Sequence, residues 1–169
     1  ELSPEQIMGL ERINLVACGT AYYASEIISS YIRKFSSVRS EAFIASEFPS
    51  QSVCSPNTLT IGISQSGETK DTLDAIFEAK KHGSHIAAMT NVIGSTLARL
   101  AGNGAYLHAG SEFAVASTKV FTNMIAAGLI FSLTISNISE LEQKKIVQEL
   151  RKLPNLISKQ LISDDGSIE

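Results

Sequence analysis

The stretch Leu59–Thr69, which reads LTIGISQSGET, decides the fold. Its first half, Leu59–Ile63, is an unbroken apolar run, which is typical of a strand buried on both faces of a sheet. Its second half begins with Ser64–Gly67, a turn of small polar residues, and apolar residues recur at helical spacing after it. The stretch therefore predicts a buried strand that passes through a tight loop into a helix.

The same alternation of strands and helices continues on both sides of this stretch. Apolar runs predict further strands at Ile13–Ala17, at His85–Thr90 and at Ala105–His108, with a weaker candidate at Ala42–Ala45. Helical spacing or turn signals predict helices at 21–35, between Gly67 and Gly83, at Ser95–Leu100 and at 116–136. Strands that alternate with helices predict a doubly wound α/β fold, in which a parallel sheet is covered on both faces. Ligands of such folds bind at the carboxyl ends of the strands.

A final helix is predicted at 139–162. Ser139 and the Glu142 that follows it three positions later form a capping-box pattern, and Pro154 is expected to kink or break the helix. No linker or repeat separates this helix from the rest, so residues 1–169 are predicted to form one domain, with a core at about 12–137 and a C-terminal helical arm. The chain begins with Glu, and we therefore expect it to be a fragment of a longer protein.

Composition excludes several classes of protein. The 169 residues hold 14 Lys and Arg against 17 Asp and Glu, and the net charge of −3 gives no basic surface for nucleic acid. Cys18 and Cys54 form no disulfide framework, and the scattered His82, His85 and His108 argue against a zinc site. Hydrophobic residues make up 44% of the chain, which is enough for one soluble domain with a core.

Neither a secretion signal nor a membrane span is expected. Residues 1–11 are polar, and the most apolar stretch, Val120–Ile135, is too short to cross a bilayer. We therefore expect a cytoplasmic protein that does not bind membranes.

The loop after Leu59–Ile63 carries the strongest functional signal. The hydroxyls of Ser64, Ser66 and Thr69 and the amide of Gln65 can all donate hydrogen bonds, and the start of a helix attracts negative charge. Gly67 lets the backbone approach a ligand closely. The loop therefore predicts a phosphate cradle that contains neither Lys nor Arg, with Glu68 pointing to solvent or to another part of the ligand. The alternative is a simple helix cap, which needs only one hydroxyl.

Other motifs give weaker signals. The loop lacks the second Gly of a GxSxG nucleophile elbow, and no GxxxxGK[ST] or GxGxxG motif is present. Cys18 at a strand end is either a nucleophile or, as we favour, a small buried residue. Lys119 is either a Schiff-base or phosphate lysine or, as we favour, a structural ion-pair partner, for which Glu112 is the candidate. Ser117 either caps the following helix or reaches the same cleft as the cradle.

The chain resembles the first sugar-isomerase (SIS) domain of the glucosamine-6-phosphate synthase family, the glutamine:fructose-6-phosphate amidotransferases. The resemblance covers about residues 12–135. It is carried by five motifs that stand in the family's order, namely Ala17-Cys18-Gly19-Thr20, Ala45-Ser46-Glu47, Ser64–Leu73 (SQSGETKDTL), Asn91 with Gly94-Ser95, and Val115–Lys119 (VASTK). It implies a five-stranded parallel sheet of flavodoxin-like type. It also implies that Ser64, Gln65, Ser66 and Thr69 hold the phosphate of fructose 6-phosphate or glucosamine 6-phosphate, with Thr20, Ser117 and the backbone of Val115 at the sugar.

The sequence departs from the family at three points. Ala21 stands where the family has a Ser that reaches the phosphosugar, and losing one hydrogen bond to a charged group weakens binding about 10- to 150-fold. Ala114 stands where the family has Gly. The groups that carry the chemistry, an acid/base Glu, a Lys and a ring-opening His, have no matching positions in this chain, so it is expected to hold no catalytic residue.

The resemblance implies a role within a larger enzyme. Glutamine supplies ammonia, fructose 6-phosphate forms an imine, and a proton moves between carbons to give glucosamine 6-phosphate; this domain binds and orients the sugar phosphate. A glutaminase domain, a second SIS domain and a homodimeric partner are implied, and no cofactor or metal. Three alternatives remain open: a sugar-phosphate-sensing regulatory module, a stand-alone isomerase or deaminase with a carboxylate in its cleft, and an assembly domain with an empty pocket.

Overall fold

The structure is a computed structural model that describes residues 4–51, 53–112 and 117–163. Its strands are β1 (Arg12–Ala17), β2 (Arg39–Ile44), β3 (Thr58–Ser64), β4 (His85–Thr90) and β5 (Gly104–Tyr106). Its helices are α1 (Pro4–Met8), α2 (Thr20–Phe35), α3 (Phe48–Gln51), α4 (Lys70–Lys81), α5 (Thr96–Ala101), α6 (Lys119–Thr134) and α7 (Glu140–Ser163). Strands and helices alternate along the chain, as the sequence predicts.

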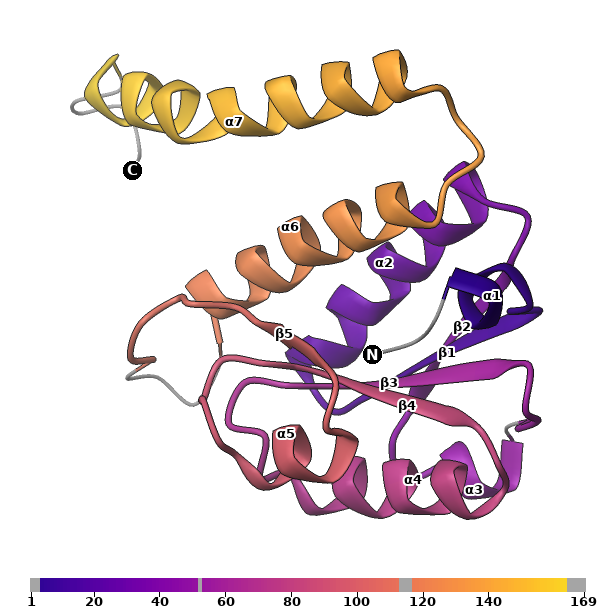
Figure 1. The fold of residues 1–169 in the computed structure, drawn as a ribbon. Helices are drawn as coiled ribbons and strands as arrows, with labels where there is room; N and C mark the ends of the chain where they lie inside the picture. Colours follow the sequence, from indigo (N-terminus) through magenta and orange to yellow (C-terminus); the bar gives the residue numbers. More distant parts are fainter. Residues whose placement is uncertain (1–3, 52, 113–116, 164–169) are drawn as a thin grey trace. The chain divides into compact units, whose positions relative to one another are not determined.

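Within the described residues, five parallel strands form one sheet in the order β2-β1-β3-β4-β5. This is the flavodoxin-like order, so the predicted doubly wound α/β fold is confirmed. Helices α2 and α6 cover one face of the sheet, and α4 and α5 cover the other (Figure 1). The chain leaves β1 toward β2 on one side and leaves β3 toward β4 on the other. The carboxyl ends of β1 and β3 therefore flank the point where the order reverses, which is where such folds bind ligands.

The central strands are buried because both of their faces are covered. Every residue of β3 is buried, and on the α2 and α6 side Ile28 and Met124 belong to the same apolar cluster as Leu15 and Ile61. Helices α2 and α6 approach closely at Gly128, where an added Cβ would lie 2.2 Å from Cγ1 of Ile28. A glycine is therefore required at this crossing.

The edges of the sheet differ from the sequence predictions. Strand β2 spans Arg39–Ile44 instead of Ala42–Ala45, and β5 spans Gly104–Tyr106 instead of Ala105–His108. Of the six residues of β2 only Ser40 and Phe43 are buried, and all three residues of β5 are exposed. An edge strand is not covered on both faces, so it carries no continuous apolar run by which its ends could be recognised. The short helices α1 and α3 were not predicted.

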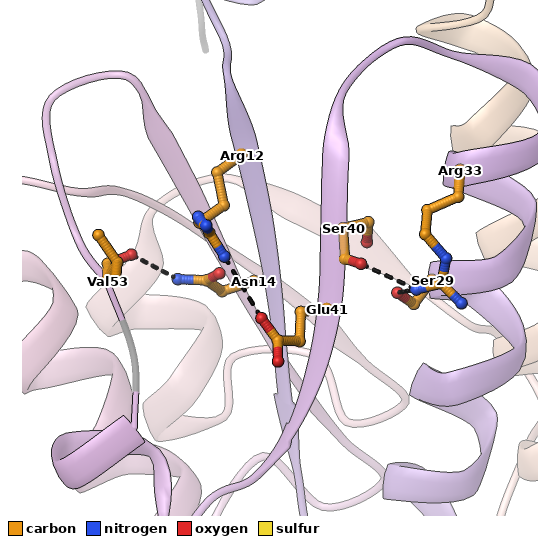
Figure 2. A network of polar contacts seen from close by, with 7 residues as sticks. All are labelled: Arg12, Asn14, Ser29, Arg33, Ser40, Glu41 and Val53. Atoms are coloured by element: carbon orange, nitrogen blue, oxygen red, sulfur yellow. Dashed lines mark hydrogen bonds and ion pairs between the residues drawn. The ribbon is translucent and has the colours of Figure 1, made fainter.

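Polar contacts anchor the β2 edge (Figure 2). The guanidinium of Arg33 on α2 donates to the Ser29 hydroxyl at 2.5 Å and to the backbone carbonyl of Ser40 at 2.8 Å. Arg12 of β1 pairs with Glu41 of β2 at 3.3 Å. The edge strand β2 is therefore anchored by one side chain from α2 and by one from the adjacent strand β1.

By its internal contacts the chain divides into two units, Glu1–Ser136 and Asn137–Glu169. In the second unit the predicted capping box is confirmed. Ser139 and Glu142 exchange hydrogen bonds between backbone and side chain, and the Ser139 hydroxyl donates to the Glu142 carboxylate at 2.7 Å. Helix α7 continues through Pro154, so of the two predicted outcomes the break is wrong and the kink stays a prediction. Proline removes the hydrogen bond to the carbonyl four residues earlier, and its ring crowds that carbonyl, but the neighbouring turns keep their own hydrogen bonds.

Candidate functional site

A cavity of about 300 Å³ lies where β1 and β3 end. This volume is at the lower end of the range for small-molecule sites. Residues from three regions line it: the turn after β1 with the start of α2, the end of β3 with the loop after it, and α6 with the residues ahead of it. They are Cys18, Gly19, Thr20, Ala21, Ile63, Ser64, Gln65, Ser66, Thr69, Glu112, Ser117 and Met124. Among the described residues, those of the predicted phosphate cradle therefore line the same cavity as Thr20 and Ser117.

Internal hydrogen bonds hold the loop after β3 in shape. The backbone N–H of Gly67 donates to the Ser64 hydroxyl oxygen at 3.0 Å, and that of Glu68 donates to the Ser66 hydroxyl oxygen at 3.1 Å. The hydroxyls of Ser64 and Thr69 lie 2.9 Å apart and share a hydrogen bond. At Gln65 the backbone carbonyl accepts from Asn91, which ties the loop to the end of β4.

These bonds leave the hydroxyls with donor capacity. Each hydroxyl has one proton to donate, and the oxygens of Ser64 and Ser66 already accept from the backbone. The Ser66 proton has no acceptor among the described residues, and of the pair Ser64 and Thr69 only one proton is used between them. A cavity wall of unused O–H donors suits an anionic oxygen ligand.

Two helices begin at the cavity wall. Helix α2 starts at Thr20 and α4 follows Thr69, and among the described residues neither has a side-chain hydrogen bond at its N-cap. Both helices are long enough for their aligned peptide dipoles to place partial positive charge at this end. Hydroxyl donors and helix dipoles therefore favour a negative group at the same place.

Gly67 fixes the geometry of the loop. Its φ is +67°, which lies in the left-handed region, and an added Cβ would lie 2.1 Å from Oγ of Ser95. Its carbonyl accepts the backbone N–H of Leu97 in α5 at 2.9 Å. The sequence suggested that Gly67 allows a ligand to come close; the structure shows that it allows α5 to come close.

The Glu68 side chain is exposed to solvent, as predicted, and does not line the cavity. Its carboxylate accepts the backbone N–H of Thr96 at 2.8 Å, at the first residue of α5. This hydrogen bond, with the Thr96 hydroxyl and then the nearby Arg99, holds the pKa of Glu68 below its ordinary value of 4.5. The negative charge of Glu68 therefore stabilises the start of α5.

A depressed pKa in the folded state makes stability depend on pH. The ionised Glu68 contributes stability above its unfolded pKa, and this contribution is lost as pH falls through the folded value. We expect Glu68→Gln to lower the melting temperature at pH 7, and we expect the difference from wild type to shrink as pH falls below the ordinary pKa of 4.5. Thermal melts from pH 7 into the acidic range test the prediction, with the exposed Glu47→Gln as control. A difference that stayed constant over this range would show that ionisation is not its source.

The structure also places the other residues that were singled out. Thr20 is exposed at the cavity mouth, Ser117 is half-buried, and the methyl group of Ala21 forms part of the wall. Cys18 lines the cavity too, with its Sγ 3.9 Å from Oγ1 of Thr72. Val115 and Ala114 lie outside the described residues.

Glu112 is the lining residue whose place the sequence did not reveal. Its Oε2 accepts from the Ser117 hydroxyl at 3.5 Å and from the backbone N–H groups of Thr118 at 3.2 Å and Val120 at 3.4 Å. The predicted ion pair with Lys119 is wrong, because this carboxylate oxygen is turned to the start of α6. The sequence did hold one signal for this contact: Glu112 stands a few residues ahead of the helix predicted at 116–136, where a carboxylate can accept from the first backbone N–H groups.

Two further features bear on the class of protein. Among residues 4–51, 53–112 and 117–163, no group of three or more His, Cys, Asp or Glu is arranged to hold a metal ion. In the same residues, no helix combines the length and apolar character needed to cross a membrane.

Comparison with known proteins gives one family. The family model described as the SIS domain matches residues 7–133. Glutamine–fructose-6-phosphate aminotransferase [isomerizing] of Clostridium acetobutylicum is 41% identical over 97% of this chain, and that of Thermus thermophilus is 35% identical over 95%. The chain spans only 28% and 27% of the length of these relatives.

Solved structures agree in fold. The C-terminal domain of glucosamine-fructose-6-phosphate aminotransferase from Francisella tularensis superposes with a TM-score of 0.88 at 34% identity, covering 95% of this chain and 47% of that one. A glucosamine-6-phosphate deaminase from Thermotoga maritima has a TM-score of 0.71 at 23% identity, covering 82% of this chain and 44% of that one. The second likeness concerns the fold alone.

Proposed function

The chain belongs to the SIS domain family, and on that premise we propose that it binds a sugar phosphate through its phosphate. One observation carries the proposal. The Ser66 hydroxyl, the Ser64–Thr69 hydroxyl pair and the starts of α2 and α4 all border one cavity at the reversal point of the sheet. These are the groups that stabilise a phosphate without a cation.

In this proposal the site has two parts. Ser64, Gln65, Ser66 and Thr69 hold the phosphate, and Thr20, Ser117 and the backbone of Val115 contact the sugar. The phosphate is remote from the reacting carbons of a hexose 6-phosphate. Binding energy gained there orients the substrate for chemistry that other groups perform.

The chain is homologous to part of the glutamine–fructose-6-phosphate aminotransferases. We extend the proposal to this parent: the chain is the sugar-phosphate-binding SIS domain of its isomerase half, with a core at 12–137 and a helical arm at 139–162. The bound sugar phosphate is then fructose 6-phosphate or the glucosamine 6-phosphate made from it. A glutaminase domain, a second SIS domain and a homodimeric partner complete the enzyme, which acts in the cytoplasm without nucleic acid or membrane.

A stand-alone isomerase would need a carboxylate in the cleft, and Glu112 is one. Its Oε2 accepts three hydrogen bonds from the start of α6, which hold the carboxylate in place. Among the described residues no second carboxylate and no His or Lys lines the cavity, so a partner for proton transfer is missing there, and we expect the isolated chain not to convert fructose 6-phosphate.

Ser66→Ala tests the proposal. We expect glucosamine 6-phosphate and fructose 6-phosphate to raise the melting temperature of the wild-type chain, since a ligand at 100 times its Kd adds about 2.7 kcal/mol of stability. Ser66→Ala removes one hydrogen bond to a charged group and is expected to weaken binding by about 10- to 150-fold. Calorimetric titration of both proteins measures the change.

The control is Ser30→Ala, which removes an exposed hydroxyl on α2 that donates to the Ile27 carbonyl. Its Kd should equal that of wild type. If millimolar sugar phosphate left the wild-type melting temperature unchanged, the cavity would not be a sugar-phosphate site, and a role in assembly alone would replace the proposal.

A further inference from the structure

One wall of the cavity carries a negative charge. Glu112 is the only charged side chain among the described residues that line it, since the others are hydroxyl, amide, thiol or apolar groups. The hydroxyls of the loop after β3, which line the same cavity, favour an anion. The two walls therefore differ in the sign of charge that they favour.

The position of the Glu112 carboxylate is fixed. Three donors reach its Oε2, namely the Ser117 hydroxyl and the backbone N–H groups of Thr118 and Val120, at 3.2–3.5 Å. Its Oε1 has no hydrogen-bond partner in the part of the chain that the structure describes. The carboxylate therefore has one oxygen that holds it in place and one that remains available to a ligand.

Glu112 also occupies the start of a helix that would otherwise attract a second anion. Three helices begin at or close to residues that line the cavity: α2 begins at Thr20, α4 follows Thr69, and α6 begins two residues after Ser117. At α2 and α4 no N-cap side chain takes a backbone N–H in the described residues, whereas at α6 the Glu112 carboxylate takes two. The positive ends of two helices thus face the cavity, and the third is neutralised.

The same residue borders the space next to the cavity. Gln65 and Glu112 line this cavity and also an adjoining hollow of about 630 Å³. Asn91 and His108 are further lining residues of that hollow. A ligand held by its phosphate at Gln65 and extending into the hollow therefore passes the Glu112 carboxylate.

We propose that Glu112 restricts the cavity to sugar phosphates with one anionic group, whose remaining part is neutral or carries an ammonium. The proposal rests on the sugar-phosphate-binding function and adds the charge selectivity of the same site. A second phosphate would lie against a fixed carboxylate in a partly desolvated cavity, whereas an ammonium would gain a partner there. We expect a penalty of roughly tenfold in Kd for the second anion.

Three probes that share one sugar ring test the selectivity: glucose 6-phosphate, glucosamine 6-phosphate and glucose 1,6-bisphosphate. Calorimetric titration of the wild-type chain should give the tightest binding for glucosamine 6-phosphate and the weakest for the bisphosphate. Glu112→Gln keeps the side-chain shape and an acceptor oxygen but removes the charge. In this variant the ratio of the bisphosphate Kd to the monophosphate Kd should fall about tenfold. The Kd of glucose 6-phosphate should change less than about twofold.

Two further variants serve as controls. Glu149→Gln on α7 also removes one negative charge, but at a residue that does not line the cavity, and it should leave all three Kd values unchanged. Glu112→Asp keeps the charge and should keep the selectivity, even where the shorter side chain alters the loop.

The proposal is overturned if Glu112→Gln tightens monophosphate and bisphosphate binding equally, because Glu112 would then repel the cradled phosphate itself. It is also overturned if Glu112→Gln leaves the ratio of the two Kd values unchanged. If the wild-type chain binds none of the three probes, the sugar-phosphate function itself fails, and that result is distinct from a loss of selectivity.

Discussion

Gly67→Ala is expected to lower the free energy of unfolding by about 3 kcal/mol and to abolish sugar-phosphate binding. Two costs add up. An alanine at a φ of +67° is strained by about 1–2 kcal/mol. Its Cβ would also lie 2.1 Å from Oγ and 2.5 Å from Cβ of Ser95, and the second atom cannot move away by a rotamer change. The loop or α5 must therefore shift, which costs about 1–3 kcal/mol and moves Ser66.

Chemical denaturation and calorimetric titration measure the two effects, and two variants separate the causes. Gly102 also has a positive φ, but an added Cβ there meets nothing within 4 Å, so Gly102→Ala should cost only the backbone strain. Ser95→Gly removes the obstructing Cβ, so the double variant Gly67→Ala/Ser95→Gly should recover stability relative to the sum of the single changes. Equal losses for Gly67→Ala and Gly102→Ala would argue against the contact with Ser95.

Gly128→Val is expected to cost about 3 kcal/mol, because it forces α2 and α6 apart. An added Cβ at Gly128 would lie 2.2 Å from Cγ1, 2.6 Å from Cδ1 and 2.9 Å from Cγ2 of the fully buried Ile28. Valine is a somewhat better helix former than glycine, but this gain of a few tenths of a kcal/mol is smaller than the overpacking. Denaturation midpoints measure the loss.

The matched control is Ala126→Val, a half-buried position on the same helix, which should cost less than about 1 kcal/mol. Ile28→Ala alone leaves a cavity and should cost about 2–5 kcal/mol. Combined with Gly128→Val it should cost less than the sum, because the valine fills the space that Ile28 vacates. Strict additivity would contradict the contact between these two residues.

The buried strands and the cradle were predictable because their causes are local. A strand covered on both faces accepts little but apolar residues, so Leu59–Ile63 is recognisable as a run. The hydroxyls of Ser64, Ser66 and Thr69 come from six consecutive positions, and all three take part in hydrogen bonds within the loop. The strand order, in contrast, followed from the resemblance of the motifs and not from the apolar runs themselves.

The hydrogen-bond partners of Glu68 and Glu112 were not predicted, because they are distant in the chain or lie on the backbone. Glu68 binds the backbone of Thr96, 28 positions along the chain, and no side-chain pattern marks that contact. Lys119 was the obvious partner for Glu112 by charge, yet backbone N–H groups at the start of α6 are nearer at hand and have no partner within the helix. Charge complementarity between side chains therefore misleads where a helix terminus competes.

The position of the cavity between β1 and β3 has a consequence for folding. Each of the pairs β1–β2 and β3–β4 joins strands that follow one another in the chain, whereas β1 and β3 are joined out of order, with Arg12 opposite Thr58. Bringing such distant segments together carries the larger loop-closure entropy. The phosphate cradle and the Thr20 turn thus meet only when this non-local pairing forms. We therefore expect the capacity to bind ligand to appear late in refolding, after the local β–α–β units have gained their secondary structure.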